Sequence, residues 1–103
     1  MNSHTDSRDI YSVSRLNRAA RLLLAEHFAV VWVEGEISNL ATPSSGHLYF
    51  TLKDADAQVR CALFRPQRAR VCFRPENGMR VLARAQVSLY EPRGDYQLLL
   101  EAL

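Results

Sequence analysis

The hydrophobic period of this sequence changes once, near residue 29, and that change limits the folds open to the chain. From Val13 to Phe28 apolar side chains recur every three to four residues, as in an amphipathic helix. Ser12 or Ser14 can cap the start of this helix by accepting a hydrogen bond from a free backbone N–H. After residue 29 apolar and polar residues alternate, which is the period of a half-buried strand. The sequence therefore predicts one helix followed by an all-β unit.

The basic positions of the predicted helix fall away from its apolar positions. Arg15, Arg18 and Arg21 are expected to form a solvated face. The residues before the helix are polar and mixed in charge, and they lack the basic-then-apolar order of a secretion signal. We therefore expect a disordered tail over residues 1–10, a helix over 11–28 and a β-barrel over 29–103.

Five segments after residue 29 alternate like strands and are separated by turns rich in Pro, Gly, Asn and Asp. Gly35 interrupts the first segment, which suggests a bulge or sharp bend where one long strand serves both halves of a small barrel. A basic segment over residues 67–74 is expected to hold a short helix. This order matches a five-stranded OB-fold barrel, although an SH3-like barrel would also fit the pattern. The strand segments are residues 30–39, 47–53, 58–64, 79–90 and 96–103.

The net charge of +2 is too small to indicate a partner, but the charges are unevenly placed. Between Ala57 and Pro75 there are five arginines and no acidic residue. A stripe of one sign attracts phosphate, whereas an ordinary soluble surface mixes signs. No apolar stretch reaches the roughly 20 residues that span a bilayer, so we expect a soluble, cytoplasmic chain without membrane contact.

The second and third predicted strands carry the candidate binding site. If the apolar residues of these strands form the core, then aromatic and cationic side chains share the outer face. Bases stack on rings while Arg and Lys follow phosphates, so such a face suits single-stranded nucleic acid. Three readings stay open: Phe64 stacks on bases or tucks into the barrel end, Tyr49 contacts bases or packs on a neighbouring strand, and His47 is a surface residue or a stacker. The expected outward set is His47, Tyr49, Thr51, Lys53, Arg60 and Phe64, and the predicted nucleic-acid-binding residues are His47, Tyr49, Lys53, Arg60, Phe64, Arg65, Arg68 and Arg70.

The sequence predicts neither a catalytic centre nor a cofactor. Two acid pairs, at positions 34 and 36 and at positions 54 and 56, have spacings expected of a solvent-facing strand and of a turn, so no metal is expected. Cys61 alternates with apolar residues and is expected in the core, and no disulfide with Cys72 is required. The Arg93–Asp95 triplet is expected to form a turn.

Five segments of the chain carry a resemblance to a known family: residues 11–17 (YSVSRLN), 33–39 (VEGEISN), 45–54 (SGHLYFTLKD), 59–65 (VRCALFR) and 87–97 (VSLYEPRGDYQ). They resemble the N-terminal domain of the large subunit of bacterial exodeoxyribonuclease VII. The resemblance implies an OB-fold that binds single-stranded DNA, followed by a larger C-terminal nuclease region. That region would hydrolyse the strand from either end without a divalent metal, and a small second subunit in several copies would complete the complex.

The chain stops at Leu103, where the remainder of such a subunit would begin. Hydrolysis is therefore not expected of this domain alone. The expected partners are single-stranded DNA, the C-terminal nuclease region and the small subunit. Two alternatives remain: the same surface serves protein assembly within the complex, or the domain binds RNA.

Overall fold

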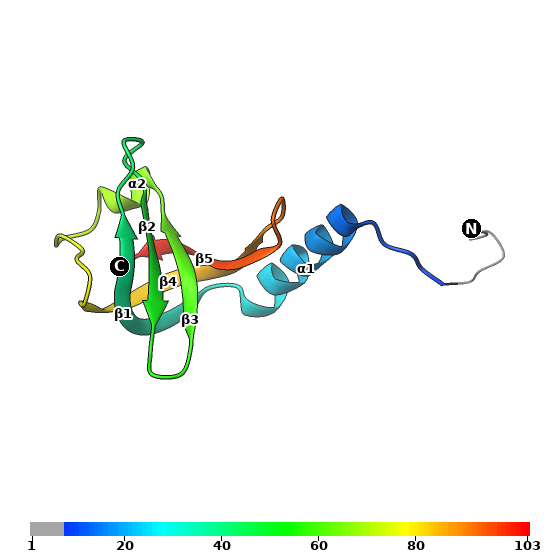
Figure 1. The fold of residues 1–103 in the computed structure, drawn as a ribbon, viewed down its shortest axis with the longest axis horizontal. Coiled ribbons are helices and arrows are strands. Elements are labelled where there is room, and N and C mark those ends of the chain that lie inside the picture. The colour runs from blue at the N-terminus through cyan, green and yellow to red at the C-terminus, as the bar shows by residue number, and fades with distance from the viewer. Residues whose placement is uncertain (1–7) are drawn as a thin grey trace.

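Two helices and five strands make up residues 8–103, the part of the chain that the computed structural model describes (Figure 1). The predicted long helix and five strands are confirmed. The short helix begins at Arg65, slightly earlier than predicted, because Pro66 occupies its first turn, where a missing N–H costs nothing. The elements are α1 (Val13–Phe28), β1 (Val31–Ala41), β2 (Leu48–Lys53), β3 (Gln58–Leu63), α2 (Arg65–Arg68), β4 (Arg80–Tyr90) and β5 (Asp95–Ala102).

The strands close into a barrel in the order β1-β2-β3-β5-β4, with β4 pairing back onto β1. Neighbours are antiparallel except β3 and β5, which run parallel. Strand β1 serves two partners, because Val31–Glu36 pairs with β4 while Glu36–Ala41 pairs with β2. Closure leaves no strand edge unpaired along this ring. The predicted five-stranded OB-fold barrel with an N-terminal helix is therefore confirmed.

Gly35 permits a close approach and lies beside Glu36, where β1 changes partner; of the two predicted alternatives, a bulge or a sharp bend, the bulge is absent at this position. A Cβ at this position would lie 2.9 Å from both the Leu52 Cγ and the Lys53 backbone oxygen, so a larger residue would push β1 away from β2. The pairing stays in register at Gly35, and the register shift occurs between Ser38 and Ala41, where Asn39 has a φ of 52°. Asparagine tolerates this left-handed backbone better than most residues.

The barrel interior is apolar, and the alternation of the strands explains its composition. On β4, for example, every second residue from Val81 to Val87 is buried. Cys61 belongs to the core as predicted, and burial raises the pKa of its thiol to about 12. Both cysteines are free. The buried residues of the core cluster are Ile37, Leu48, Phe50, Leu52, Cys61, Leu63, Val81, Ala83, Ala85, Val87, Leu98 and Leu100.

Helix α1 extends from the barrel (Figure 1), and its partly buried residues are Asn17, Ala20, Arg21 and Leu24, of which Leu24 packs against the core. The Asn17 Nδ2 donates a hydrogen bond of 3.0 Å to the Glu91 backbone oxygen. Arg21 forms an ion pair with the Glu91 carboxylate. The prediction that the arginines of this helix form a solvated face is therefore wrong for Arg21, because Glu91 in the β4–β5 turn draws it toward the barrel. The large apolar side chains that remain exposed on α1 are Val13, Leu16, Leu22, Leu23 and Phe28.

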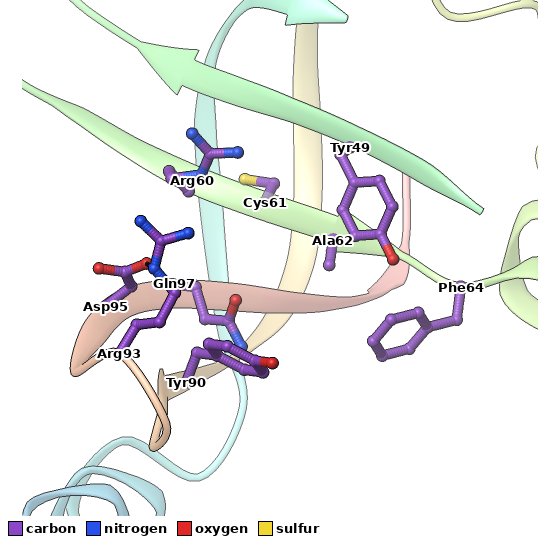
Figure 2. A pocket seen from close by; sticks show the side chains of 9 residues that line it. All are labelled: Tyr49, Arg60, Cys61, Ala62, Phe64, Tyr90, Arg93, Asp95 and Gln97. Atoms are coloured by element: carbon purple, nitrogen blue, oxygen red, sulfur yellow. Dashed lines mark ion pairs between the residues drawn. The ribbon is translucent and has the colours of Figure 1, made fainter. Parts of the chain in front are cut away.

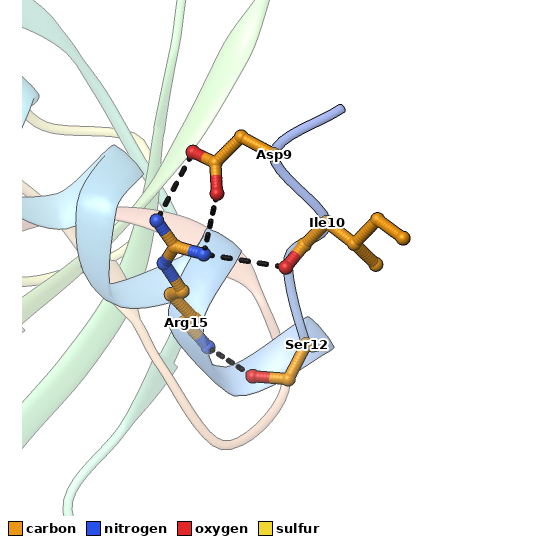
Figure 3. Close-up of polar contacts among 4 residues, drawn as sticks. All are labelled: Asp9, Ile10, Ser12 and Arg15. Atoms are coloured by element: carbon orange, nitrogen blue, oxygen red, sulfur yellow. Dashed lines mark hydrogen bonds and ion pairs between the residues drawn. The ribbon is translucent and has the colours of Figure 1, made fainter. Parts of the chain in front are cut away.

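The start of α1 is fixed by local polar contacts (Figure 3). Ser12 Oγ accepts a hydrogen bond of 3.1 Å from the Arg15 backbone N–H, which confirms the predicted cap. The Arg15 guanidinium donates to both carboxylate oxygens of Asp9, at 3.0 and 3.1 Å, and to the Ile10 carbonyl at 3.2 Å. The hydrogen bond to Asp9 raises the pKa of Arg15 above its ordinary value. Residues 1–7 of the predicted tail lie outside the described residues. Neither helix in residues 8–103 is both long and apolar enough to cross a membrane.

Candidate nucleic-acid interface

A hollow of about 380 Å³ opens on the outer surface of the barrel over β2, β3 and β5 (Figure 2). We call it the β2–β3–β5 hollow. Its volume falls within the range of roughly 300–1,000 Å³ typical of small-molecule sites. Its lining residues are Tyr49, Arg60, Cys61, Ala62, Phe64, Tyr90, Arg93, Asp95 and Gln97.

A small residue between larger ones creates the depression. Ala62 is only 4% exposed although its neighbours Cys61 and Leu63 point into the core. It pairs across the sheet with Tyr49 on β2 and with Leu99 on β5. Because alanine ends at Cβ, the surface sinks between these two larger side chains. Ala62 is therefore the floor of the hollow.

Three aromatic side chains surround this floor: Tyr49, Phe64 and Tyr90 (Figure 2). Phe64 follows β3 and keeps 39% of its surface exposed, so it does not tuck into the barrel interior. Its ring meets the His47 ring edge to face, with centroids 5.2 Å apart. His47 Nδ1 in turn accepts a hydrogen bond of 3.0 Å from the Arg65 backbone N–H. His47 thus supports the position of Phe64 from the side.

The hollow also carries cationic groups with little acidic compensation. Arg60 lies opposite Gln97 in the parallel β3–β5 pair. Within residues 8–103, no carboxylate comes within ion-pair distance of Arg60. Arg93 Nε lies 3.6 Å from Asp95 Oδ2, but both side chains are well exposed and such pairs contribute little. The hollow can therefore attract an anionic ligand and stack flat rings.

The structure separates the predicted binding residues into two groups. Lys53 lies at the far end of β2, 3.8 Å from the Glu36 carboxylate. Arg68 donates a hydrogen bond of 3.0 Å to the Gly46 carbonyl. These two residues, together with Arg70, do not line the hollow. The predicted residues that line it are Tyr49, Arg60 and Phe64, while His47 and Arg65 adjoin Phe64.

Thr51 departs from the expected outward set. It is only 5% exposed, whereas alternation predicts an outward-facing side chain. Ser38 on β1 and Arg60 on β3 are its cross-strand partners. A short side chain between these neighbours is covered even on the outer surface of a tightly curved sheet. Thr51 is therefore not available for direct contact with a ligand.

Sequence reasoning missed the residues that β4, β5 and their turn add to the hollow: Tyr90, Arg93, Asp95 and Gln97. Because β3 and β5 pair in parallel, Gln97 lies next to Arg60 despite a long separation in sequence. The general OB architecture offered a signal, since the loop between its fourth and fifth strands commonly contributes to ligand binding.

A metal site has no support among the described residues, where no group of three or more His, Cys, Asp or Glu side chains could hold an ion. Asp54 serves the β2–β3 turn. Its Oδ1 accepts hydrogen bonds of 2.9 Å from the backbone N–H groups of Asp56 and Ala57, and these bonds lower the pKa of Asp54. The prediction that this acidic pair belongs to a turn is confirmed.

Comparison with known proteins agrees with the geometry. Residues 11–103 match the family described as OB-fold nucleic acid binding domain. The chain is 62% identical over 97 residues to the exodeoxyribonuclease 7 large subunit of Haemophilus influenzae (strain 86-028NP), covering 94% of this chain and 22% of that protein. It is 59% identical over 99 residues to the exodeoxyribonuclease 7 large subunit of Enterobacter sp. (strain 638), covering 96% of this chain and 22% of that protein.

These matches confirm the resemblance found in the sequence, and they also define its extent. The chain spans only about a fifth of the length of these relatives. The family match, in contrast, covers nearly the whole chain and includes α1 and all five strands of the described structure. The chain therefore belongs to the family of OB-fold nucleic acid binding domains.

Proposed function

We propose that this domain binds single-stranded DNA across the β2–β3–β5 hollow. One observation carries the proposal: three aromatic rings and two arginines surround a single depression on the outer surface of the barrel. A single strand exposes the flat faces of its bases, which a duplex hides. Each base stacked on an aromatic ring contributes about 1–3 kcal/mol, largely independent of sequence.

The cations follow the strand on either side of the stacked bases. Arg60 and Arg93 border the hollow, and Arg65 adjoins Phe64 at its end. Neutralising about three phosphates on a single strand gives a slope near −2 when the logarithm of affinity is plotted against the logarithm of salt concentration. Arg68, at the end of α2, and Arg70, just after it, extend this basic track for longer strands, and Lys53 extends it at the far end of β2.

In a longer protein, the domain would deliver its strand to a nuclease region. The relatives that support this idea are named exodeoxyribonuclease 7 large subunits, and this chain corresponds to 22% of their length. We infer that hydrolysis belongs to the remaining part of such a protein and that a smaller subunit joins the same complex. The site of action would be the cytoplasm, and the isolated domain would bind DNA without cleaving it.

Titration of a fluorescently labelled oligo-dT at two salt concentrations tests the proposal. Saturable binding with a slope near −2 is expected, and the labelled strand should remain intact after prolonged incubation. A matched oligo-U competitor measures any preference for the 2′-hydroxyl, which distinguishes RNA from DNA. Stronger competition by oligo-U than by unlabelled oligo-dT would favour RNA as the ligand. No binding of either strand would reject the hollow as a nucleic-acid site.

A further inference from the structure

The β2–β3–β5 hollow contains one polar side chain suited to distinguishing one base from another. Gln97 lies on β5, lines the hollow and is partly buried. Figure 2 shows its amide on the same side of the sheet as the aromatic and arginine side chains. A base stacked over the Ala62 floor would have its edge within reach of β5, because Ala62 and Leu99 are cross-strand partners.

The Gln97 amide is free to bind a ligand. Within residues 8–103 it makes no hydrogen bond to another side chain or to backbone. A partly buried amide without a protein partner relies on water or a ligand for its hydrogen bonds. The neighbouring Gln86, on β4, contrasts with it because its Nε2 donates to Glu101 at 3.2 Å.

The charged groups of the hollow lack a hydrogen-bond donor beside an acceptor. Arg60 and Arg93 can only donate hydrogen bonds, and Asp95 can only accept them while ionised. The Gln97 amide alone, among these four polar residues, offers a donor and an acceptor side by side. Such a pair matches a base edge that also presents a donor beside an acceptor.

Adenine satisfies this condition on more of its edges than thymine does. It presents an adjacent donor and acceptor on both of its exposed edges: N6–H with N1 on one, and N6–H with N7 on the other. Thymine has such a pair only on its pairing edge, since its other edge carries O4 and a methyl group. A stacked adenine can therefore form both hydrogen bonds with the Gln97 amide through either of these two edges. A stacked thymine can form both only when its pairing edge faces the amide.

We propose that Gln97 is a specificity-determining residue that makes this hollow prefer adenine over thymine in single-stranded DNA. This inference rests on the proposed function, because it requires a base to stack in the hollow. Stacking on Phe64 and Tyr90 supplies affinity that hardly depends on sequence. The Gln97 amide adds the part of the affinity that depends on the base sequence. The domain would thus bind all strands while favouring some.

The test measures the affinities of wild type and Gln97→Leu for labelled dA12 and dT12. Leucine keeps a similar volume on the outer surface while removing both hydrogen-bonding groups. In wild type, the ratio of dA12 to dT12 affinity should exceed the ratio in Gln97→Leu by about five-fold or more. Comparing ratios cancels the intrinsic stacking of the adenine strand, because that stacking is the same for both proteins.

Gln86→Leu provides the matched control, since it makes the same change on the outer surface away from the lining of the hollow. It should leave the wild-type ratio unchanged, and thermal melting should show all three proteins folded. Equal loss of both affinities in Gln97→Leu would make Gln97 a general contact and overturn the proposal, as would no change in either. If wild type binds neither strand, the proposed function itself fails. If it binds both and the ratio does not move, only the base-reading role fails.

Discussion

Two outer faces of the same barrel carry similar residue types but arrange their charges differently. One is the β2–β3–β5 hollow, and the other is the outer face formed by β1 and β4. The β1–β4 face also has an aromatic anchor, since Trp32 is 63% exposed and pairs across the strands with Arg84. Judged by residue type alone, both faces suit nucleic acid. The members of the β1–β4 face are Trp32, Glu34, Glu36, Arg80, Leu82 and Arg84.

The acidic residues distinguish the two faces. On the β1–β4 face, Glu34 and Glu36 lie among the arginines, and Arg84 Nε lies 3.5 Å from the carboxylate of Glu101. In the hollow, Asp95 is the only acidic lining residue, and Arg60 has no acidic partner among residues 8–103. A phosphate that approaches the β1–β4 face meets nearly equal numbers of positive and negative side chains. The two faces therefore differ in the balance of charges around their aromatic residues and not in the number of arginines, and the proposed site lies on the face with less acidic compensation.

Depressions alone do not distinguish the faces either. A second hollow, of about 480 Å³, lies at one end of the β1–β4 face. Apolar side chains dominate its lining, and Arg80 is its one charged member among the described residues. A strand laid there would find stacking surfaces and little to hold its phosphates. The lining residues are Phe73, Met79, Arg80, Val81, Leu82 and Leu103.

The largest difference is expected from the aromatic residues. Phe64→Ala should weaken binding of oligo-dT roughly ten-fold or more, because a lost stacking contact costs about 1–3 kcal/mol. Trp32→Ala, which removes a larger and more exposed ring from the opposite face, should change the affinity less than two-fold. Fluorescence titration of both variants checks this. A larger loss for Trp32→Ala would move the binding site to the β1–β4 face.

A smaller difference is expected from the arginines. Arg60→Ala should reduce affinity roughly five-fold at low salt, about 1 kcal/mol for one charged contact. It should also make the salt slope shallower by about 0.7, the share of one phosphate on a single strand. Arg84→Ala should alter neither quantity, because Glu101 already balances that charge. Equal slopes for the two variants would show that the position of an arginine on the barrel does not matter.

The sequence predicted the strands well because alternation is a local property. Tyr49, Arg60 and Phe64 were assigned to one surface by parity along two adjacent strands, and all three line the hollow. Thr51 is buried although parity assigned it to the outer surface. Parity predicts the side of the sheet on which a side chain lies, but not how far neighbouring side chains cover it. Helical spacing had a similar limit. It predicted α1 but did not reveal that Arg21 would pack against the barrel while Leu23 stays exposed.

The other half of the hollow depends on a pairing that no local pattern encodes. Gln97 reaches Arg60 only because β5 adds to β3 in parallel. Tyr90 and Arg93 follow from the same closure, since they flank the turn that leads into β5. Residues on strands far apart in sequence become neighbours through barrel topology, which the family resemblance implied but single-strand periodicity could not. The hollow is thus partly predictable from sequence and completed by the fold.

The smallest expected effects come from removing one acidic residue that pairs with an arginine at each face, and they test charge balance directly. Asp95→Asn should raise affinity for oligo-dT about two-fold at low salt, because it releases Arg93 beside the stacking surfaces and removes a repulsion of phosphate. Glu101→Gln releases Arg84 in the same way but leaves Glu34 and Glu36 in place, so it should raise affinity less than Asp95→Asn.

Titrations of both variants at low and high salt measure these gains, which should vanish at high salt because exposed charges are screened. The two substitutions remove the same charge, so any difference between them reports where the strand lies and not the net charge of the domain. A gain for Glu101→Gln that equals the gain for Asp95→Asn would mean that the whole surface attracts DNA diffusely. A gain confined to Asp95→Asn would place the phosphates beside the β4–β5 turn, next to the arginine that this turn carries.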